Sequence, residues 1–521
     1  MNKTKNIDDL KYFILVLCLL LIGCNKNTDK SNTDPFPYVY EDKKTENDFD
    51  FLFEGIVDLQ KQYLLVGAEV LIIRNDTILL HDVVGWSDKE KGIKLQKNTI
   101  HRIRSMAKPI VATAILILLD EGKLSLDDRV ASYIPAFDNP KSRQITIQQL
   151  LTHTSGLINH DYEEIGLSKP PHEFETLGEV VDEIGQIGPI VQSGKFYYSG
   201  SGIATLTRLI SIVSGVSAET FIQERIFNPL NMTDSYTRFR PGVGWANKLN
   251  PTYKWSDSIN NFTQYWNATL EPEYKYFRGH GGVYSTAMDY AKFLSLYLNE
   301  GKFNNKRILS EQIMQKAQSI LVPLPLKAPQ SHQSLAWKIQ IPDTLSNDIG
   351  YFQHNGSDGT MAYAYPKENT IALYFNQSRN HPRFIFEDLM AATPPYDAYR
   401  KWNYHNEYLD QWKEILLRDQ QEQSNDLNKQ FEAYLGPYKC INNDGFSSEI
   451  LIKNDQLIIK NLQTGNEITL NHYQKNEFIC RFWPPTDGFI SKVIFRKNYE
   501  NSQSFTLEWL NNTKFEFEKI K

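Results

Sequence analysis

The 521-residue sequence lacks the marks of several large protein classes. It has four cysteines and neither a C-x-x-C nor an H-E-x-x-H pattern, so we expect no metal and no other cofactor. The net charge is -6 and no long run of one sign occurs, which argues against a nucleic-acid partner, because that requires a basic face. No G-x-S-x-G elbow occurs, which excludes an α/β-hydrolase.

One apolar run stands out, and it lies at the N-terminus. Three lysines precede Tyr12–Ile22, a run too short to span a bilayer but typical of a signal peptide. It ends at Gly23-Cys24, which resembles a bacterial lipobox; the alternative is a plain signal peptide with an incidental cysteine. We therefore expect a lipoprotein signal peptide over 1–24, lipidation at Cys24 and a flexible tether over 25–48. The protein would be exported and lipid-anchored to a bacterial membrane, in the periplasm or at the cell surface.

The next region, 49–394, alternates strand and helix patterns. Strands are predicted over 68–74 and 77–81, with Gly85 ending the second, and again over 335–341, 360–365 and 370–376. Helices are predicted over 109–119 and 290–298. Strands at both ends with helices between them predict an α+β domain. Its first and last strands would pair in an antiparallel sheet flanked by helices, beside a separate helical cluster.

The pattern changes in the C-terminal quarter of the chain, residues 395–521. Residues 395–430 are polar and helical, either a connector or the last helix of the preceding domain. From 431 to 521 short strands recur, which predicts a small all-β sandwich or barrel. Its strands are expected at 449–452, 456–459, 467–470, 478–480, 492–495, 504–507 and 514–517. Cys440 and Cys480 could form a disulfide in an oxidising compartment, or be two buried thiols.

The sequence Ser105-Met-Ala-Lys108 carries the chemistry. Residues three apart share one face of a helix, so the Ser105 hydroxyl and the Lys108 amine meet if a helix begins near Ser105, and Pro109 suits a first turn. A serine hydroxyl is a weak nucleophile that needs an adjacent base, and a buried lysine can lose its proton and serve. Alone, S-x-x-K is a weak signal, but here an apolar helix follows at once.

With its surroundings, this motif resembles the serine β-lactamase and penicillin-binding protein superfamily. The resemblance is closest to the class C β-lactamase-like branch, which includes peptidases and esterases. Further matches occur in the family's order and cover most of residues 50–390. They are Ile145–Leu157, Tyr198-Ser199-Gly200, Phe227–Asp234, Gly281–Tyr290 and His354-Asn355-Gly356. The 431–521 module resembles lipocalin-like domains appended to such hydrolases.

The resemblance implies roles for several of these residues. Tyr198 would relay a proton between Ser105 and the leaving group, because a lysine ammonium nearby favours the phenolate. The segment His354-Asn355-Gly356 would edge the substrate site on a strand. The backbone N–H of Ser357, paired with that of Ser105, would bind the oxyanion. His153 is interpreted as structural.

Two positions depart from the family pattern. Gly200 stands where an asparagine is usual, and His354 stands where a lysine helps hold a carboxylate. Both weaken the case for antibiotic hydrolysis and leave attack on an acyl group intact. The sequence therefore predicts a hydrolase forming an acyl-enzyme on Ser105, a peptidase or amidase or an esterase acting on small molecules or peptides. A true β-lactamase or D-Ala carboxypeptidase is the alternative, and a binding or scaffold protein on the same fold is the alternative of another class.

Overall fold

The computed structural model describes most of the chain beyond residue 48. The described residues are 39–40, 49–61, 65–159, 165–240, 242–256, 261–269, 274–324, 331–341, 348–379, 386, 390, 396, 431–442, 447–453, 456–462, 467–474, 477–482, 489–497, 503–509 and 514–520. The predicted signal peptide, most of the tether and all but Tyr396 of the connector lie outside these residues. The boundaries proposed for those segments stay predictions. Within the described residues, no single helix is long and apolar enough to cross a membrane.

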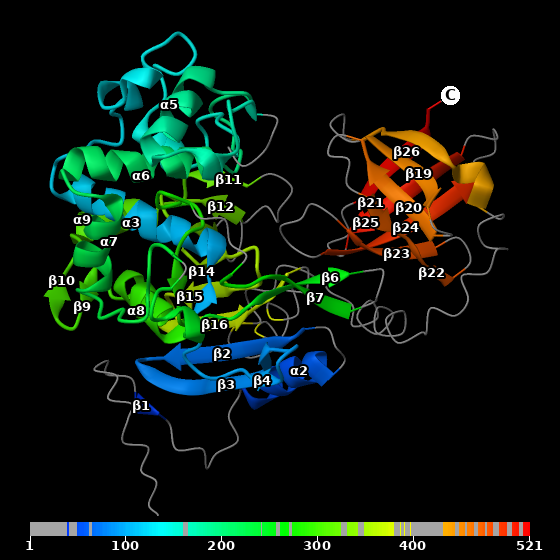
Figure 1. Cartoon of the computed structure of the whole chain (residues 1–521), viewed down its shortest axis with the longest axis horizontal. Helices are drawn as coiled ribbons and strands as arrows, with labels where there is room; N and C mark the ends of the chain where they lie inside the picture. The colour runs from blue at the N-terminus through cyan, green and yellow to red at the C-terminus, as the bar shows by residue number, and fades with distance from the viewer. Residues whose placement is uncertain are drawn as a thin grey trace, which may run out of the picture. The chain divides into compact units, whose positions relative to one another are not determined.

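A ten-stranded sheet forms the centre of the first described region (Figure 1). Its order is β1-β3-β2-β16-β15-β14-β13-β12-β11, with β4 paired to β3. Strands β2 and β16 pair antiparallel from Arg74 with Thr370 to Ala68 with Asn376, which confirms that the first and last long strands are neighbours. The strands are β1 (Val39–Tyr40), β2 (Gly67–Arg74), β3 (Thr77–Asp88), β4 (Ile93–Lys94), β11 (Val322–Pro323), β12 (Ser331–Gln333), β13 (Lys338–Gln340), β14 (Tyr351–Asn355), β15 (Met361–Tyr365) and β16 (Thr370–Asn376).

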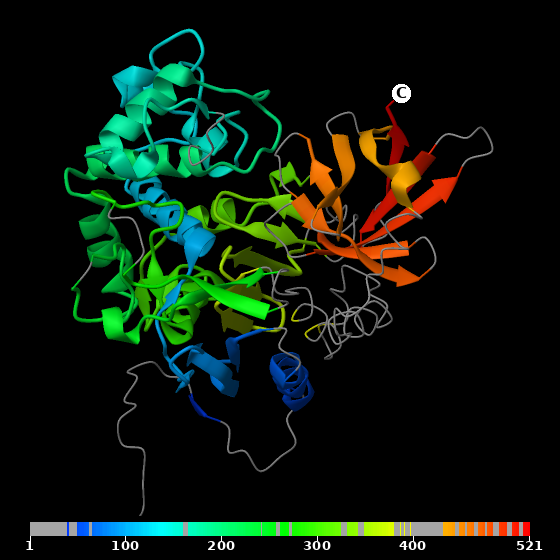
Figure 2. The same ribbon diagram turned by 45° about the vertical axis from the view of Figure 1, so that its right-hand side comes forward.

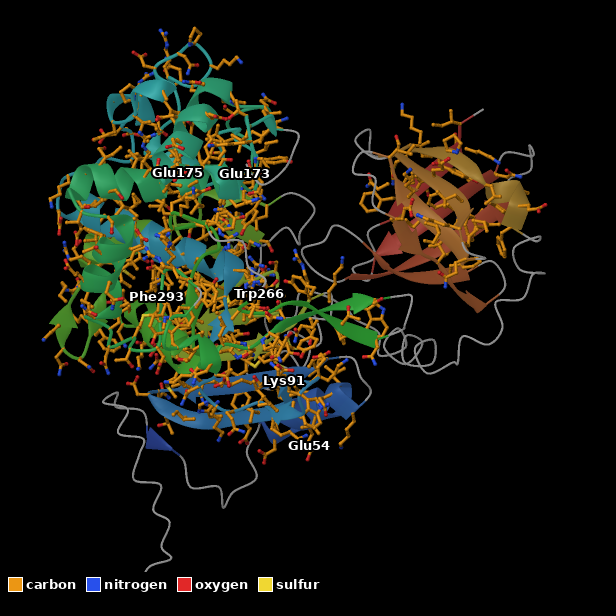
Figure 3. The ribbon with its side chains drawn as sticks, viewed as in Figure 1. Glu54, Lys91, Glu173, Glu175, Trp266 and Phe293 are labelled. Atoms are coloured by element: carbon orange, nitrogen blue, oxygen red, sulfur yellow. The ribbon has the colours of Figure 1, made fainter. Side chains whose placement is uncertain are left out.

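Helices cover both faces of this sheet. Alternate side chains of each strand point to opposite faces, and both sets are buried in the central strands. Helix α2 (Asp50–Lys61) packs with Val70, Tyr363 and Tyr374 on one face. Helix α8 (Ala287–Leu298) packs on the other, where Phe293, labelled in Figure 3, lies 5.8 Å from the ring of Trp337. The long central strands are therefore buried on both sides and read as continuous apolar runs.

A helical cluster lies beyond the sheet, with α5 and α6 stacked past α3 on the side away from α2 in both views (Figures 1 and 2). Helix α3 is buried from Ala107 to Leu118, as expected for a helix that is apolar all round. The predicted helix after Ser105 is thus confirmed. The cluster and its neighbours are α3 (Ala107–Asp120), α4 (Ile147–Leu151), α5 (Leu177–Ile187), α6 (Gly200–Ser214), α7 (Ala218–Ile222) and α9 (Glu311–Ala317).

Two strand predictions in this domain were wrong in extent. Strand β3 runs on to Asp88 through Gly85, which has a φ of +82°. A side chain there would collide with the Val66 carbonyl oxygen. Gly85 therefore permits a close approach between the paired strands β2 and β3 and does not end the strand. The strand predicted over 335–341 is only β13, because Ser334 and Trp337 form a turn before it.

Three smaller pairings complete the domain. Strand β5 (His101–Arg102) pairs with β8 (Tyr284–Ser285), just before the Ser105 turn. Strands β6 (Thr252–Ser256), β7 (Asn261–Trp266) and β17 (Ser378–Arg379) form a three-stranded sheet, and β9 (Lys302–Phe303) pairs with β10 (Lys306–Arg307). The β5–β8 pair brings residues 101–105 against the segment that contains His280.

The C-terminal region is a curved, nine-stranded antiparallel sheet, drawn in orange and red in Figure 1. All seven predicted strands are present, and two more, β18 and β22, join them. Its core is aromatic and aliphatic, with Tyr438, Phe495 and Phe505 buried. The strands are β18 (Gly436–Cys440), β19 (Ser447–Lys453), β20 (Gln456–Asn461), β21 (Glu467–Thr469), β22 (Asn471–Gln474), β23 (Glu477–Phe482), β24 (Phe489–Lys497), β25 (Gln503–Trp509) and β26 (Lys514–Lys519).

The predicted disulfide in this sheet is not tested. Cys440 is buried, and its sulfur lies 3.1 Å from Asn442 Oδ1. The side chain of Cys480 is outside the described residues. A bond between Cys440 and Cys480 therefore stays a prediction.

Candidate active site

The Ser105–Lys108 turn opens the site. Ser105 lies in a short 3₁₀ turn, Arg104–Met106, that runs directly into α3. One helical turn on, Lys108 Nζ lies 3.0 Å from Ser105 Oγ, the proximity that the three-residue spacing predicts. The turn is closed by the backbone N–H of Met106, which donates to the Ile103 carbonyl oxygen at 3.0 Å.

Lys108 is an unusual lysine for its burial. It is only 5% exposed and projects from an apolar helix. Its Nζ donates to the carbonyl oxygen of His280 at 2.8 Å and lies 4.7 Å from the centroid of the Tyr198 ring. Lys108 Nζ therefore donates hydrogen bonds to two oxygens, one of them the Ser105 hydroxyl.

Tyr198 approaches from the helical side, just before α6. Its ring is half-buried and lies 4.8 Å from the His153 ring and 6.3 Å from the His354 ring. A second ammonium, Lys338 Nζ, lies 5.4 Å from the ring centroid. Tyr198 is thus flanked by two lysines from different elements, and only Lys108 was predicted.

His153 and Ser199 hold the Tyr198 segment in place. The Ser199 side chain caps α6 by accepting from Gly202 N, and its own N–H donates to His153 Nδ1 at 3.2 Å. The carbonyl of His153 accepts from Tyr197 N at 2.8 Å. Burial, with the charges of Lys108 and Lys338, lowers the pKa of His153 to about 3, so its ring is neutral and accepts hydrogen bonds. These contacts agree with a structural role for His153.

Gly200 leaves room for an amide from another segment. A side chain at Gly200 would collide with the Asn159 amide oxygen, and the backbone N–H of Gly200 donates a hydrogen bond to that oxygen. The missing asparagine of the family pattern therefore has a neighbour of the same chemistry in its space. Asn159 was not predicted as a site residue, because its only signal in the sequence is its place just after the Thr-Ser-Gly turn.

The strand wall of the site is β14 and the residues after it. His354 lies on β14 and is 3% exposed. Its Nδ1 lies 3.0 Å from the Asn355 carbonyl oxygen. Burial, reinforced by Lys338 and Lys108, holds the pKa of His354 well below its usual range. His354 is therefore neutral and cannot supply the positive charge of the lysine that it replaces.

Lys338 supplies a cation at this wall instead. It lies on β13 opposite Gln353 of β14, and its side chain is half-buried. Lys338 was not predicted as a site residue, because a short strand pattern does not show which residue of the neighbouring strand a lysine will face. Only the strand register brings it to Tyr198.

Gly356 lets the two walls touch. A side chain at Gly356 would collide with the carbonyl oxygen of Ile103, two residues before Ser105. Its N–H donates to the carbonyl oxygen of Thr360 at 2.8 Å, which closes the turn containing Ser357. The predicted oxyanion segment and the Ser105 turn are therefore in direct contact, and Asn355 precedes them at the end of β14.

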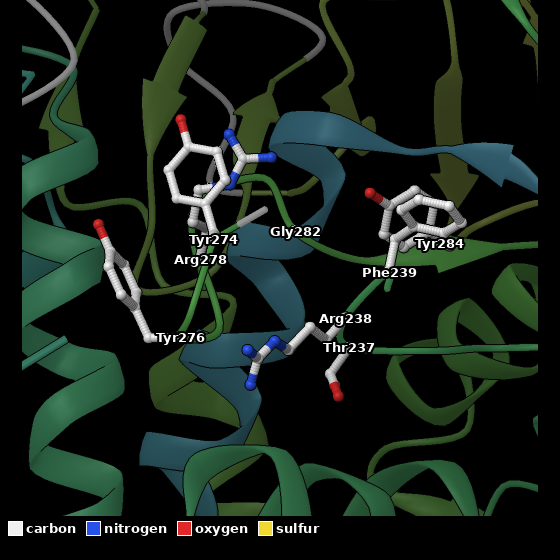
Figure 4. Close-up of a pocket in the computed structure, with 8 residues that line it drawn as sticks. All are labelled: Thr237, Arg238, Phe239, Tyr274, Tyr276, Arg278, Gly282 and Tyr284. Carbon is white, nitrogen blue, oxygen red and sulfur yellow. The ribbon is translucent and has the colours of Figure 1, made fainter. Parts of the chain in front are cut away.

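A small pocket lies behind the turn that binds Lys108. The backbone N–H groups of Gly281 and Gly282 both donate to the Arg278 carbonyl oxygen, at 3.0 and 2.6 Å, and this turn contains His280. Figure 4 shows Arg278 beside Tyr274, with its guanidinium carbon 3.9 Å from the ring centroid. The pocket is lined by Thr237, Arg238, Phe239, Tyr274, Tyr276, Arg278, Gly282 and Tyr284.

Among the described residues, no group of three or more histidine, cysteine, aspartate or glutamate side chains is placed to hold a metal ion. The polar groups gathered at Ser105 are instead a hydroxyl, two amines, a phenol and two neutral imidazoles. Together they can move a proton and hold an anion, which are the tasks of acyl transfer.

Comparison with known proteins agrees with this geometry. A model of the beta-lactamase family matches residues 52–394. A putative penicillin-binding protein, PbpX, of Bacillus subtilis is 32% identical over 233 residues, 44% of this chain and 54% of that protein. An uncharacterized protein of Mycobacterium tuberculosis is 25% identical over 273 residues, 48% of this chain and 66% of that protein. The chain thus spans about two thirds or less of these two relatives.

Solved structures show the same fold. The octameric penicillin-binding protein homologue from Pyrococcus abyssi is 20% identical with a TM-score of 0.58, and the match covers 90% of this chain and 99% of that one. EstCE1, described as a hydrolase with promiscuous acyltransferase activity, is 19% identical with a TM-score of 0.56, over 66% of this chain and 99% of that one. At these identities the likeness concerns the fold alone.

Proposed function

Because this chain belongs to the beta-lactamase family, we propose that it is a serine hydrolase that forms an acyl-enzyme on Ser105. The observation that carries the proposal is the 3.0 Å separation of Lys108 Nζ and Ser105 Oγ at the start of a buried helix. A base within hydrogen-bond reach is what a serine hydroxyl needs to become a nucleophile.

The proposed reaction has two halves. Lys108 takes the Ser105 proton as Oγ attacks the substrate carbonyl carbon, and the backbone N–H groups of Ser105 and Ser357 bind the resulting oxyanion. The bond to the leaving group breaks as Tyr198 gives its proton to the departing alcohol or amine, and Lys108 returns the proton it took from Ser105 to Tyr198. In the second half, water gives one proton to Lys108 and attacks the acyl carbon. The acyl–Oγ bond then breaks, the acid leaves, and Ser105 Oγ takes that proton back from Lys108.

The substrate class that we favour is an ester, or a peptide or amide. The neutral His354 and the bare Gly200 support this choice over β-lactams, which the class C branch is known to hydrolyse. One observation favours a second candidate, a β-lactamase or D-Ala carboxypeptidase. Lys338 and Asn159 bring an ammonium and an amide near the two changed positions, so a substrate with a carboxylate could still be held.

A covalent probe for reactive serines tests the proposal. A fluorophosphonate should label the purified protein, and Ser105→Ala should abolish the labelling. Ser193→Ala, an exposed serine in the loop before Tyr198, should leave it intact. Labelling that survives Ser105→Ala would assign the nucleophile elsewhere. A protein that no probe labels would support the alternative of a binding or scaffold protein.

Intact-mass measurement then separates the substrate classes. The protein is exposed in turn to p-nitrophenyl esters, D-alanyl peptides and penicillins. The mass of any adduct on Ser105 is measured, together with the release of product. Release of hydrolysed penicillin would favour a β-lactamase, and a persistent penicillin adduct together with turnover of D-alanyl peptides would favour a D-Ala carboxypeptidase.

We also propose that the protein is exported and lipid-anchored through Cys24, and that residues 431–521 are a lipocalin-like accessory domain. The apolar run before Cys24 and the polar stretch after it support the anchor. Metabolic labelling with palmitate should mark the protein in a bacterial host, and Cys24→Ser should remove the label. Retained labelling in that variant would point to another acylation site.

A further inference from the structure

A buried carboxylate lies directly behind the proposed oxyanion segment. Asp358 follows Ser357 and is 1% exposed. Its Oδ2 lies 2.7 Å from Arg104 Nε and 3.8 Å from Arg102 Nε. Its Oδ1 lies 4.0 Å from Arg379 Nη1 and accepts a hydrogen bond from the Tyr265 hydroxyl. One carboxylate thus gathers groups from three separate segments.

The electrostatics keep this carboxylate charged. Burial by itself raises the pKa of Asp358, but the charges of Arg104, Arg102 and Arg379 and the Tyr265 hydrogen bond outweigh it, so the pKa is held well below its usual range. Arg102 in turn lies over the ring of Trp266, labelled in Figure 3, at 3.7 Å. The cluster is therefore rigidly packed, and Arg104 is its closest cation.

Arg104 occupies an unusual backbone position. It immediately precedes Ser105 and has a φ of +48°, a region that side chains other than glycine rarely adopt. Such a conformation persists only where surrounding contacts hold it, and such residues gather at active sites. The ion pair with Asp358, at 2.7 Å, is a contact that can hold Arg104 in this conformation.

The ion pair also joins the two backbone segments that must bind the oxyanion. Arg104 is one residue before Ser105, and Asp358 is one residue after Ser357. The same segments meet again where Gly356 abuts the Ile103 carbonyl, which the Thr360 hydroxyl also reaches at 3.4 Å. Side-chain charge and backbone contact therefore fix the same pair of segments.

We propose that Asp358 is a positioning residue whose carboxylate, by binding the Arg104 guanidinium, holds the backbone N–H groups of Ser105 and Ser357 in the relative position that an oxyanion hole requires. This inference rests on the proposed function and adds a residue to it. Asp358 itself touches no substrate.

The test compares two buried carboxylates. Asp358→Asn keeps the shape and removes the charge, and we expect kcat for p-nitrophenyl acetate to fall by about 10²-fold, since the loss of one oxyanion donor costs about 10²–10³ in kcat. KM should stay within about twofold, because the loss falls on the transition state. Asp289→Asn is the matched control: Asp289 is 3% exposed and binds Lys292 Nζ at 3.0 Å in helix α8. That control should lower thermal stability and leave kcat within about twofold.

A double variant separates positioning from a general loss of stability. If Asp358 acts through Arg104, Arg104→Met lowers kcat by a similar factor. The kcat of the double variant is then no lower than that of the less active single variant. Losses that multiply would overturn the proposal, because independent residues behave additively in free energy. All assays are run below the unfolding temperature of each variant.

The remaining outcomes are also decisive. If Asp358→Asn does not fold, Arg104→Lys replaces it, since lysine keeps the charge but not the geometry of the guanidinium. An unchanged kcat in a folded Asp358→Asn or Arg104→Lys protein, beside an active unaltered protein, would overturn this inference alone. An unaltered protein that turns over no ester would overturn the proposed function instead.

Discussion

The two walls of the site are built in opposite ways. The helix wall is local: Ser105 and Lys108 are three residues apart and meet within one turn. The strand wall is assembled from distant segments: His354 lies on β14, Lys338 on β13, and Asp358 reaches back to Arg104 across 254 residues. The helix wall carries a buried amine at the nucleophile, while the strand wall carries a neutral histidine and a half-exposed amine. Chemistry is therefore expected at the first wall and substrate choice at the second.

Removal of the Lys108 amine is expected to have the greatest effect and tests whether the chemistry takes place at the helix wall. Lys108→Met should lower kcat/KM for p-nitrophenyl acetate by about 10³-fold or more, because the serine loses its base. Lys195→Met, which removes an exposed lysine near Tyr198, should change it by less than about twofold. Comparable activity in Lys108→Met would transfer the role of base to another group.

Tyr198 stands between the walls, and its hydroxyl can be removed alone. Tyr198→Phe keeps a ring between the two ammonium groups, and we expect kcat to fall about 10²-fold, the usual size of one proton-transfer contribution. Steady-state kinetics over a range of pH would measure it. Tyr197→Phe, on the neighbouring exposed tyrosine, is the control and should behave as the unaltered protein. A full-rate Tyr198→Phe protein would leave the phenol only a packing role.

A variant of Lys338 tests whether the strand wall selects the substrate. Lys338→Met should lower kcat/KM about tenfold, or about 1.4 kcal/mol, for an ester bearing a carboxylate near the scissile bond. A neutral ester of the same length should be turned over at the unaltered rate. Lys338→Arg keeps the charge and should retain most of the preference. Equal losses on both esters would mean that Lys338 supports Tyr198 rather than the substrate.

The smallest expected effect concerns stability and pH. Because the pKa of His153 is about 3 in the folded protein and near 6.5 when unfolded, its stability contribution is present above pH 6.5 and is lost as pH falls toward 3. Near pH 5 that loss amounts to about 1.4 kcal/mol per pH unit. Urea unfolding of His153→Asn between pH 5 and 6.5 should show a slope smaller by about this amount. His172→Asn, an exposed histidine, should leave the slope unchanged, and an unaltered slope in His153→Asn would contradict a buried neutral ring.

Much of the fold could be predicted because its signals are periodic and local. The apolar run after Ser105 specified α3, continuous apolar runs specified β2, β15 and β16, and short apolar stretches between polar turn residues specified the C-terminal strands. The strand end predicted at Gly85 was wrong, because glycine both ends strands at loops and permits a close approach between paired strands. Only the neighbouring Val66 carbonyl distinguishes the two cases. Strand ends and crossings depend on partners that a local pattern does not contain.

The amino-acid sequence was enough to place the Ser105 hydroxyl beside the Lys108 amine, since a helix of fixed pitch brings residues three apart together. Tertiary structure alone decided that His354 is neutral, that Lys338 is the second cation, that Asn159 fills the space beside Gly200, and that Asp358 joins the Ser105 turn. Protonation depends on burial and on neighbouring charges, and both arise only when distant segments pack. Residue spacing therefore predicts the contact between Ser105 and Lys108, whereas the contacts of Lys338 and Asp358 form only when distant segments pack together.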